Sequence, residues 1–103
     1  MATKKSAAVK FLDGLIGAPM TLGRMLASIR GEDATSLAVF AKRLGVSRQH
    51  LHAVEADRAA VSVARAARWA KILGYDPLLF VELTLQSEIQ AAGLKARIKV
   101  EAA

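Results

Sequence analysis

Four side chains suited to polar chemistry lie within five residues near the middle of the chain. The stretch RQHLH carries Arg48, Gln49, His50 and His52. Imidazole can ligate a metal ion, transfer a proton or donate a hydrogen bond, so the histidines could belong to a metal site, a catalytic site or a binding surface. The spacing of these residues, and the elements that carry them, decide among the three.

This spacing does not predict a metal site or a catalytic site. Two residues apart in a helix, His50 and His52 point about 200° apart around the axis, whereas helical metal ligands are three or four residues apart. The chain has no cysteine, and no carboxylate or hydroxyl lies at a spacing typical of a catalytic set. We therefore expect no metal, no cofactor and no enzymatic activity.

Capping residues place the stretch in one of five short helices. Apolar residues at helical spacing predict the first helix over about 21–31. Serine or aspartate at N-cap positions, and glycine just past the end, mark four more. The predicted helices are 37–44, 48–56, 63–73 and about 77–92, with caps at Ser36, Ser47, Ser62 and Asp76 and ends at Gly45, Gly74 and Gly93. We expect a mainly α fold, because 103 residues suffice for one such domain.

The helix over 48–56 has one apolar and one polar face. On a helical wheel, Leu51 and Val54 point into the core, while Gln49 lies opposite them with Arg48 and His52 beside it. Arginine can hold guanine and glutamine can hold adenine through paired hydrogen bonds, and histidine can donate to a base edge or a phosphate. Together with the preceding helix, which Gly45 ends, the segment forms a predicted helix-turn-helix suited to the DNA major groove.

The charge of the chain is positive and unevenly distributed. The net charge is +6 and the pI about 10.2, which favours a polyanionic partner. Residues 42–71 carry seven Lys or Arg and two Asp or Glu, whereas residues 72–94 carry three acidic and no basic residues. This separation predicts a polarised surface rather than evenly solvated helix faces.

The segment SLAVFAKRLGVSRQHLHAVEADR resembles the helix-turn-helix of the Xre family, the lambda-repressor/Cro-like DNA-binding domains. The resemblance covers about residues 20–82 and implies a five-helix lambda-repressor-like domain whose helix 48–56 enters the major groove. The features that carry it are Phe40-Ala41, Leu44-Gly45-Val46-Ser47, Leu51, Glu55 and the stretch ARWAKILGYD at 67–76.

The resemblance also implies roles for individual residues. Arg30 matches the family's arginine that pairs with the glutamate matched by Glu55, which implies a structural ion pair. By position, Arg48, Gln49, His52 and Ala53 would face bases, and Ser47 and nearby basic groups would face phosphates. The full set of candidate DNA-binding residues is Ser47, Arg48, Gln49, His50, His52, Ala53, Lys42, Arg43 and Arg58.

Two positions depart from the family pattern. Where the family commonly has a phosphate-binding glutamine at the start of its second helix, this chain has Leu37, so one backbone anchor is missing. Where the family favours glycine two residues after the glutamate, this chain has Asp57, which adopts a left-handed conformation at some cost. Both leave the fold intact and affect how the domain docks.

Outside the helices, we expect an N-terminal arm with a short apolar patch over 1–19 and, after the domain at 20–93, a C-terminal strand over 94–103. The stretch LKARIKVEA alternates between apolar and charged residues, which is the pattern of a strand. No other segment has this pattern, so we expect the strand to pair with the same strand of a second chain about a two-fold axis.

Taken together, the residues predict a dimeric, sequence-specific DNA-binding regulator, most simply a repressor at a palindromic operator. The alternative is an antitoxin that binds a protein toxin and represses its own operon, because terminal additions of this kind occur among such proteins. No apolar run approaches the roughly 18–20 residues that cross a bilayer. We expect a cytoplasmic protein without a membrane partner.

Overall fold

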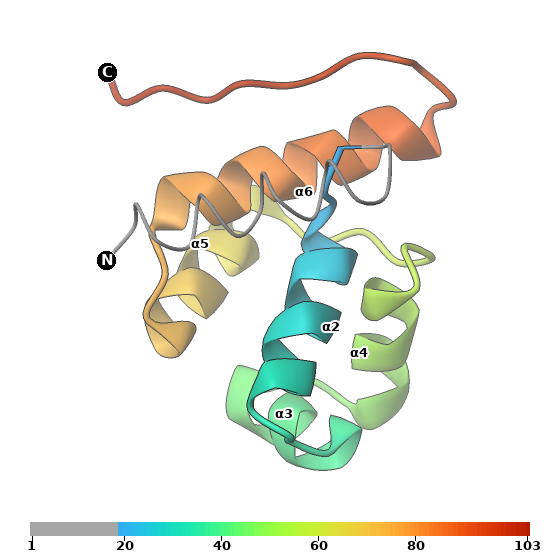
Figure 1. Ribbon diagram of the computed structural model, residues 1–103, viewed down its shortest axis with the longest axis vertical. Helices are drawn as coiled ribbons and strands as arrows, with labels where there is room; N and C mark the ends of the chain where they lie inside the picture. The colour runs from blue at the N-terminus through green and yellow to red at the C-terminus, as the bar shows by residue number, and fades with distance from the viewer. Residues whose placement is uncertain (1–18) are drawn as a thin grey trace.

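The computed structural model describes residues 19–103, which form five helices followed by an extended C-terminal segment (Figure 1). The mainly α fold and the predicted helix ranges are confirmed to within one or two residues. All but one residue of the predicted N-terminal arm, 1–19, lies outside the described residues. The helices are α2 (Leu22–Glu32), α3 (Leu37–Leu44), α4 (Arg48–Glu55), α5 (Val63–Leu73) and α6 (Pro77–Ala91).

The helix ends follow the predicted capping residues. The hydroxyl oxygens of Ser36, Ser47 and Ser62 each accept a hydrogen bond from the backbone N–H three residues further on, at 3.0–3.1 Å. At the C-terminal ends of α3 and α5, Gly45 and Gly74 adopt φ values of 77° and 80°. Glycine takes this left-handed conformation without steric cost, so both helices end where the sequence predicts.

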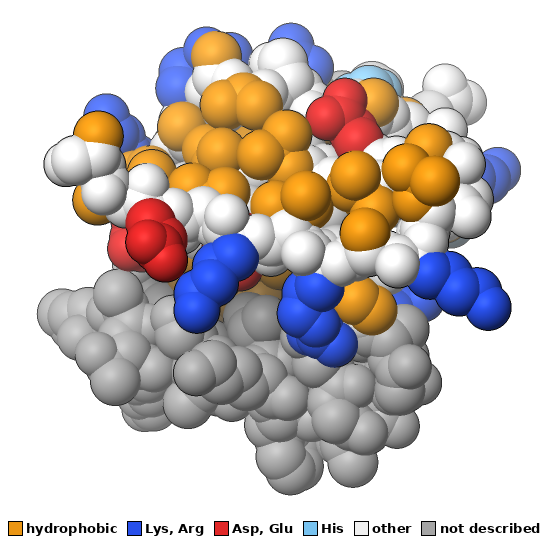
Figure 2. Space-filling model, turned by 90° about the horizontal axis from the view of Figure 1, so that it is seen from above, with side chains coloured by type: hydrophobic (Ala, Val, Ile, Leu, Met, Phe, Trp, Pro, Cys, Tyr) orange, Lys and Arg blue, Asp and Glu red, His pale blue; other side chains and the backbone are white. Residues whose placement is uncertain are grey.

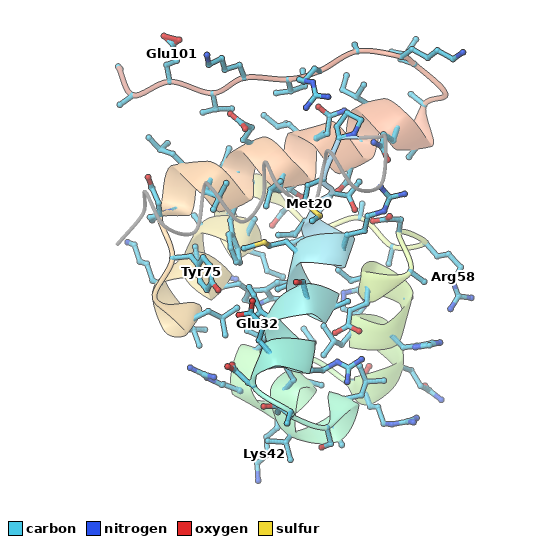
Figure 3. The ribbon with its side chains drawn as sticks, viewed as in Figure 1. Met20, Glu32, Lys42, Arg58, Tyr75 and Glu101 are labelled. Carbon is cyan, nitrogen blue, oxygen red and sulfur yellow. The ribbon has the colours of Figure 1, made fainter. Side chains whose placement is uncertain are left out.

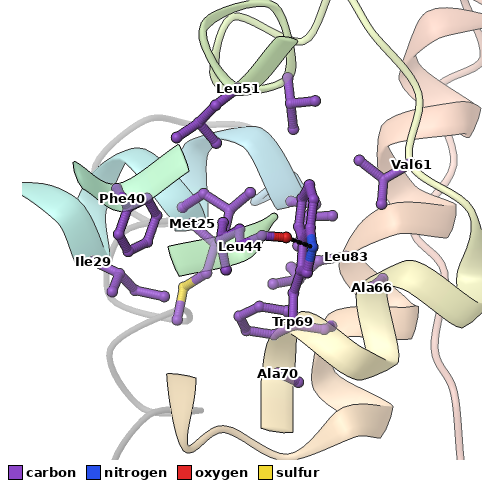
Figure 4. Close-up of a cluster of buried hydrophobic side chains, with 14 of the residues drawn as sticks. Met25, Ile29, Phe40, Leu44, Leu51, Val61, Ala66, Trp69, Ala70 and Leu83 are labelled. Atoms are coloured by element: carbon purple, nitrogen blue, oxygen red, sulfur yellow. Dashed lines mark hydrogen bonds between the residues drawn. The ribbon is translucent and has the colours of Figure 1, made fainter. Parts of the chain in front are cut away.

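The helices surround one apolar core, and Figure 1 shows α2 in the middle, with α5 and α4 on either side of it and α6 across the top. Trp69 lies in this core at 2% exposure and donates from Nε1 to the carbonyl oxygen of Leu44 at 3.1 Å (Figure 4). That bond ties the end of α3 to α5. Leu51 and Val54, the two residues of α4 predicted to point inward, are 0% and 2% exposed. The core therefore holds α4 by one face and leaves the other free.

Helices α2 and α4 approach closely at Gly23, in the first turn of α2. A Cβ atom there would collide with the carbonyl oxygen of Val54 and lie 2.6 Å from Oδ1 of Asp57. Asp57 has the predicted left-handed backbone, with φ 59°, and its carboxylate accepts a hydrogen bond from Oγ1 of Thr21 at 3.1 Å. Thr21 is the N-cap of α2, so Asp57, which follows the end of α4, also contacts the start of α2.

The C-terminal segment (residues 94–103) corrects one prediction. Within residues 19–103 no strand is formed, and the segment runs in an extended course back along α6 (Figure 1). The premise that it lacks a partner in its own chain is wrong, because side chains of α6 bind its backbone. Gln86 donates to the oxygen of Ala96 and accepts from the N–H of Ile98, and Glu82 accepts from the N–H of Val100, each at 2.8 Å.

Candidate nucleic-acid interface

The helix-turn-helix consists of α3, a turn at Gly45 and Val46, and α4. Gly45 reverses the chain, and the N–H of Val46 donates to the carbonyl oxygen of Ala41 at 3.0 Å, which closes the end of α3. Ser47 then begins α4 as its N-cap. Three residues thus separate two helices that pack against the same core. The short turn, with the hydrogen bonds from Gly45 and Val46 back to α3, limits the angle between the two helices.

The polar side chains predicted to face bases lie together on the outer face of α4. Arg48, Gln49 and His52 are exposed, and no hydrogen bond or ion pair engages their side chains within residues 19–103. Ala53 is half-buried beside them, and Ser47 is exposed at the start of the helix. The structure therefore brings these five residues to one surface, on which the side-chain donors and acceptors of Arg48, Gln49 and His52 are unused.

His50 differs from the other predicted site residues of α4. It is half-buried, and its Nε2 has no solvent contact and no hydrogen-bond partner among the described residues. A ring nitrogen enclosed by protein atoms is poorly placed to reach a base edge. A wheel with 100° per residue places His50 between the two faces and could not show to which side its ring turns.

Basic side chains flank this face. Lys42 and Arg43 are exposed in the last turn of α3, and Arg58 is exposed just after α4. Figure 3 shows Lys42 at the bottom of the molecule, under α3, and Arg58 beyond the upper end of α4. Arg43 also donates from Nη2 to the carbonyl oxygen of Ile72 at 3.4 Å, so part of its hydrogen-bonding capacity is already used. The arrangement gives a polar helix face between positive charges, which matches a base-reading helix between phosphates.

The predicted ion pair between Arg30 and Glu55 is present, and it is bidentate. Arg30 of α2 donates from Nε to Oε2 of Glu55 at 2.9 Å and from Nη2 to Oε1 at 3.0 Å. A third donor, Nη1, reaches the carbonyl oxygen of Thr35 at 3.3 Å. The hydrogen bonds to Glu55 raise the pKa of Arg30 above its ordinary value, against the opposing effect of burial. Because Glu55 ends α4, the pair fixes that end of the helix to α2.

Sequence reasoning missed a second tie between the same two helices. Besides the hydrogen bond from Thr21, Oδ2 of Asp57 lies 3.9 Å from Nε of Arg24. Asp57 is noticeable in the sequence only as a departure from glycine, and nothing there indicates that its carboxylate reaches α2. The tie compensates in part for the left-handed backbone that aspartate adopts at this position.

The described residues hold no group of three or more His, Cys, Asp or Glu side chains that could bind a metal ion. In the same part of the chain, no helix has both the length and the apolar character needed to span a bilayer. The conspicuous feature of this surface is thus the polar face of α4 with its basic flanks.

Comparison with known proteins agrees with this geometry. A family model described as helix-turn-helix matches residues 26–80, which is more than half of the chain. The match begins inside α2 and ends in the first turn of α6, so it includes all of α3 and α4. No curated protein and no solved structure matches the chain. The chain belongs to the Xre, or lambda-repressor-like, family of helix-turn-helix proteins.

Proposed function

We propose that the protein is a sequence-specific DNA-binding regulator of transcription that inserts α4 into the major groove. The observation that carries this proposal is the group of unengaged side chains on the outer face of α4. Arg48, Gln49 and His52 leave their hydrogen-bonding groups free in the unbound protein, and buried residues of the same helix hold them in place. Such groups are suited to read base edges, while Lys42 and Arg58 are suited to contact phosphates.

The regulator acts as a dimer and, most simply, as a repressor. One short helix reads only a few base pairs, so two half-sites are needed for specificity among many competing sequences. Two-fold related helices of this kind contact half-sites about 34 Å apart, which implies a palindromic operator. A dimer that covers such a site near a promoter blocks polymerase without further machinery. The cytoplasmic location expected from the sequence belongs to the same proposal.

An antitoxin role is the second candidate, and an exposed apolar surface favours it. Figure 2, which looks down on α6 and the C-terminal segment, shows a broad apolar area bordered by Lys and Arg side chains. Large apolar areas of this kind commonly mark protein interfaces. In this second role a protein toxin, in place of a second copy of the chain, occupies this area while α4 binds DNA. The reading frame next to this gene distinguishes the two roles, because an antitoxin is expected beside a small toxin gene and co-purifies with its product.

Selection of bound sequences from random duplexes tests the proposal directly. We expect a two-fold symmetric site for the full chain. Arg48→Ala and Gln49→Ala should each weaken binding to that site by about 1–3 kcal/mol and relax the preference at one base position. Lys71→Ala is the matched control, since Lys71 is exposed on α5, on the opposite side of α2 from α4 (Figure 1).

Lys42→Ala separates base reading from phosphate contact. We expect it to weaken binding to all sequences alike. The slope of the logarithm of the binding constant against the logarithm of the salt concentration should become shallower by about one. No enriched sequence in the selection, or unchanged base preference in both α4 variants, would rule out α4 as the reading helix.

A further inference from the structure

The C-terminal segment is held by a built site on α6. Gln86 is 3% exposed, yet both of its amide atoms bind the segment, one to the oxygen of Ala96 and the other to the N–H of Ile98. One turn earlier on the helix, Glu82 binds the N–H of Val100. All three contacts go to backbone atoms of even-numbered residues, so α6 recognises the extended shape of the segment.

These contacts leave the opposite edge of the segment outward. In an extended chain the N–H and C=O groups of successive residues point to opposite sides. Since the even-numbered residues face α6, the odd-numbered ones face away from it. The backbone groups of Lys99 and Glu101 have no hydrogen-bond partner among the described residues. An extended edge with unpaired backbone groups is a template on which another strand can pair.

The surface around this edge is apolar enough to form an interface. Leu94 is 57% exposed and Leu78 of α6 is 39% exposed, although large aliphatic side chains usually avoid water. Ile98 and Val100 are only half-buried against α6. Figure 2, which is seen from above relative to Figure 1, shows a broad apolar area on this side of the molecule. A partner strand on this side would pair with the free backbone groups of the edge and would also remove the apolar area from water.

We propose that this partner is a second copy of the chain, whose C-terminal segment pairs antiparallel with the outward edge, and that Gln86 and Glu82 are positioning residues for this pairing. The inference deepens the proposed dimeric regulator and rests on it. By holding the segment extended before the partner arrives, the two side chains remove part of the ordering cost of association. A segment that pairs only with itself also produces a closed two-fold dimer, since the same surface is used on both copies.

The charges of the segment limit where the two-fold axis can lie. An axis at Ile98 would place Arg97 opposite Lys99 of the second copy twice, and like charges directly opposite are destabilising. An axis at Lys99 places Glu101 opposite Arg97, and an axis at Val100 places Glu101 opposite Lys99. Opposite charges meet twice in both of these registers, but an axis at Lys99 also places Lys99 opposite itself, so we prefer the axis at Val100 and keep Lys99 as the second position.

Single-cysteine variants test this placement, because the chain has no cysteine of its own. Residues directly opposite in antiparallel strands have Cα atoms about 4.5–5.5 Å apart, within the range of a disulfide. We expect mild oxidation to cross-link Lys99→Cys or Val100→Cys to dimers, and Lys95→Cys much less. Lys71→Cys, exposed on α5, is the control for random collision. If neither position cross-links more than this control, the proposal is wrong.

Gln86→Leu tests the positioning role, since leucine keeps an apolar contact but removes both hydrogen bonds. We expect the dimer dissociation constant measured by sedimentation to rise at least tenfold. The dissociation constant of Gln86→Glu should lie between those of the parent and Gln86→Leu, because glutamate still accepts from the N–H of Ile98 but cannot donate to the oxygen of Ala96. Glu88→Gln, at an exposed position of the same helix, should match the parent. Equal dimer affinity in Gln86→Leu and the parent would remove Gln86 from this role.

Deletion of residues 94–103 covers the case in which Gln86→Leu does not fold. The deleted chain should be monomeric while the emission of buried Trp69 stays native. A dimer of unchanged affinity after deletion would overturn the proposal. These measurements need no DNA, so a negative result for the dimer interface can be distinguished from a failure of the proposed DNA-binding function. A cross-linked dimer that binds no duplex would contradict the regulator and leave the interface standing.

Discussion

Removing Arg30 and removing Glu55, the two partners of the ion pair, should destabilise the fold by different amounts. The side chain of Glu55 is 8% exposed, whereas that of Arg30 is 29% exposed. If Arg30 is replaced by methionine, which has similar length and no charge, a buried carboxylate loses its partner. Stranding a buried charge costs about 3–5 kcal/mol. For a domain of this size we expect the melting temperature to fall by about 12 °C or more.

Glu55→Gln should cost less. The amide oxygen of glutamine can still accept one hydrogen bond from Arg30, and the partly exposed guanidinium can turn to water. The loss is that of a charge-assisted hydrogen bond, about 1–2 kcal/mol. The double variant should lose less than the sum of the two single losses, because the carboxylate that Arg30→Met strands is then absent.

Thermal melts followed by the emission of Trp69, the single tryptophan, measure all three variants. Arg24→Met is the matched control, since the ion pair of Arg24 with Asp57 has a distance of 3.9 Å and both side chains are about one-third exposed. We expect it to cost below about 1 kcal/mol. An Arg30→Met variant as stable as Arg24→Met would refute the reasoning, and additive losses in the double variant would show that the two residues act independently.

Two further predictions concern the close approach of α2 to α4 and the single tyrosine. Gly23→Ala should lower the free energy of unfolding by about 1–3 kcal/mol, as overpacking does, because the added Cβ collides with the backbone oxygen of Val54. Urea melts measure this loss, and a variant more stable than the parent would contradict it. Burial and the nearby carboxylates of Glu32 and Asp33 raise the pKa of Tyr75. The neutral phenol therefore stabilises the folded protein fully below about pH 10, and this contribution is lost as the pH rises through the pKa of the folded state. Titration of phenolate absorbance in the folded protein should therefore give a midpoint above the ordinary value and a lower midpoint in Glu32→Gln, and an ordinary midpoint would contradict this assignment.

The helical part of the fold could be predicted because its signals are local. Ser47 caps α4 through its own side chain, and Gly45 ends α3 through its own backbone, so neighbouring residues fix both boundaries. The partners Arg30 and Glu55 are 25 residues apart and came from the family resemblance, since no local pattern joins them. Prediction thus succeeded where a few adjacent residues, or a known family, specify the contact.

The C-terminal segment could not be predicted in the same way. Its alternation is that of a strand, and strands normally pair with strands, so a partner outside the chain was the simpler expectation. In the structure the inner edge is bound by Gln86, a side chain on a helix. No periodic pattern marks a single glutamine as a substitute for a neighbouring strand. The orientation of His50 was equally hidden, because it depends on how one ring packs.

The two ties at the end of α4 have a consequence for how this protein can change over generations. Arg30 and Asp57 hold the end of α4 on its inner side, whereas the side chains of Arg48, Gln49 and His52 make no hydrogen bond or ion pair within residues 19–103. Substitutions at these three outer positions should therefore cost little stability, as exposed positions usually do. Copies of the gene could acquire new operators by changes on this face alone, without compensating mutations elsewhere. Regulatory circuits built on such a scaffold can diverge quickly while the domain itself stays the same.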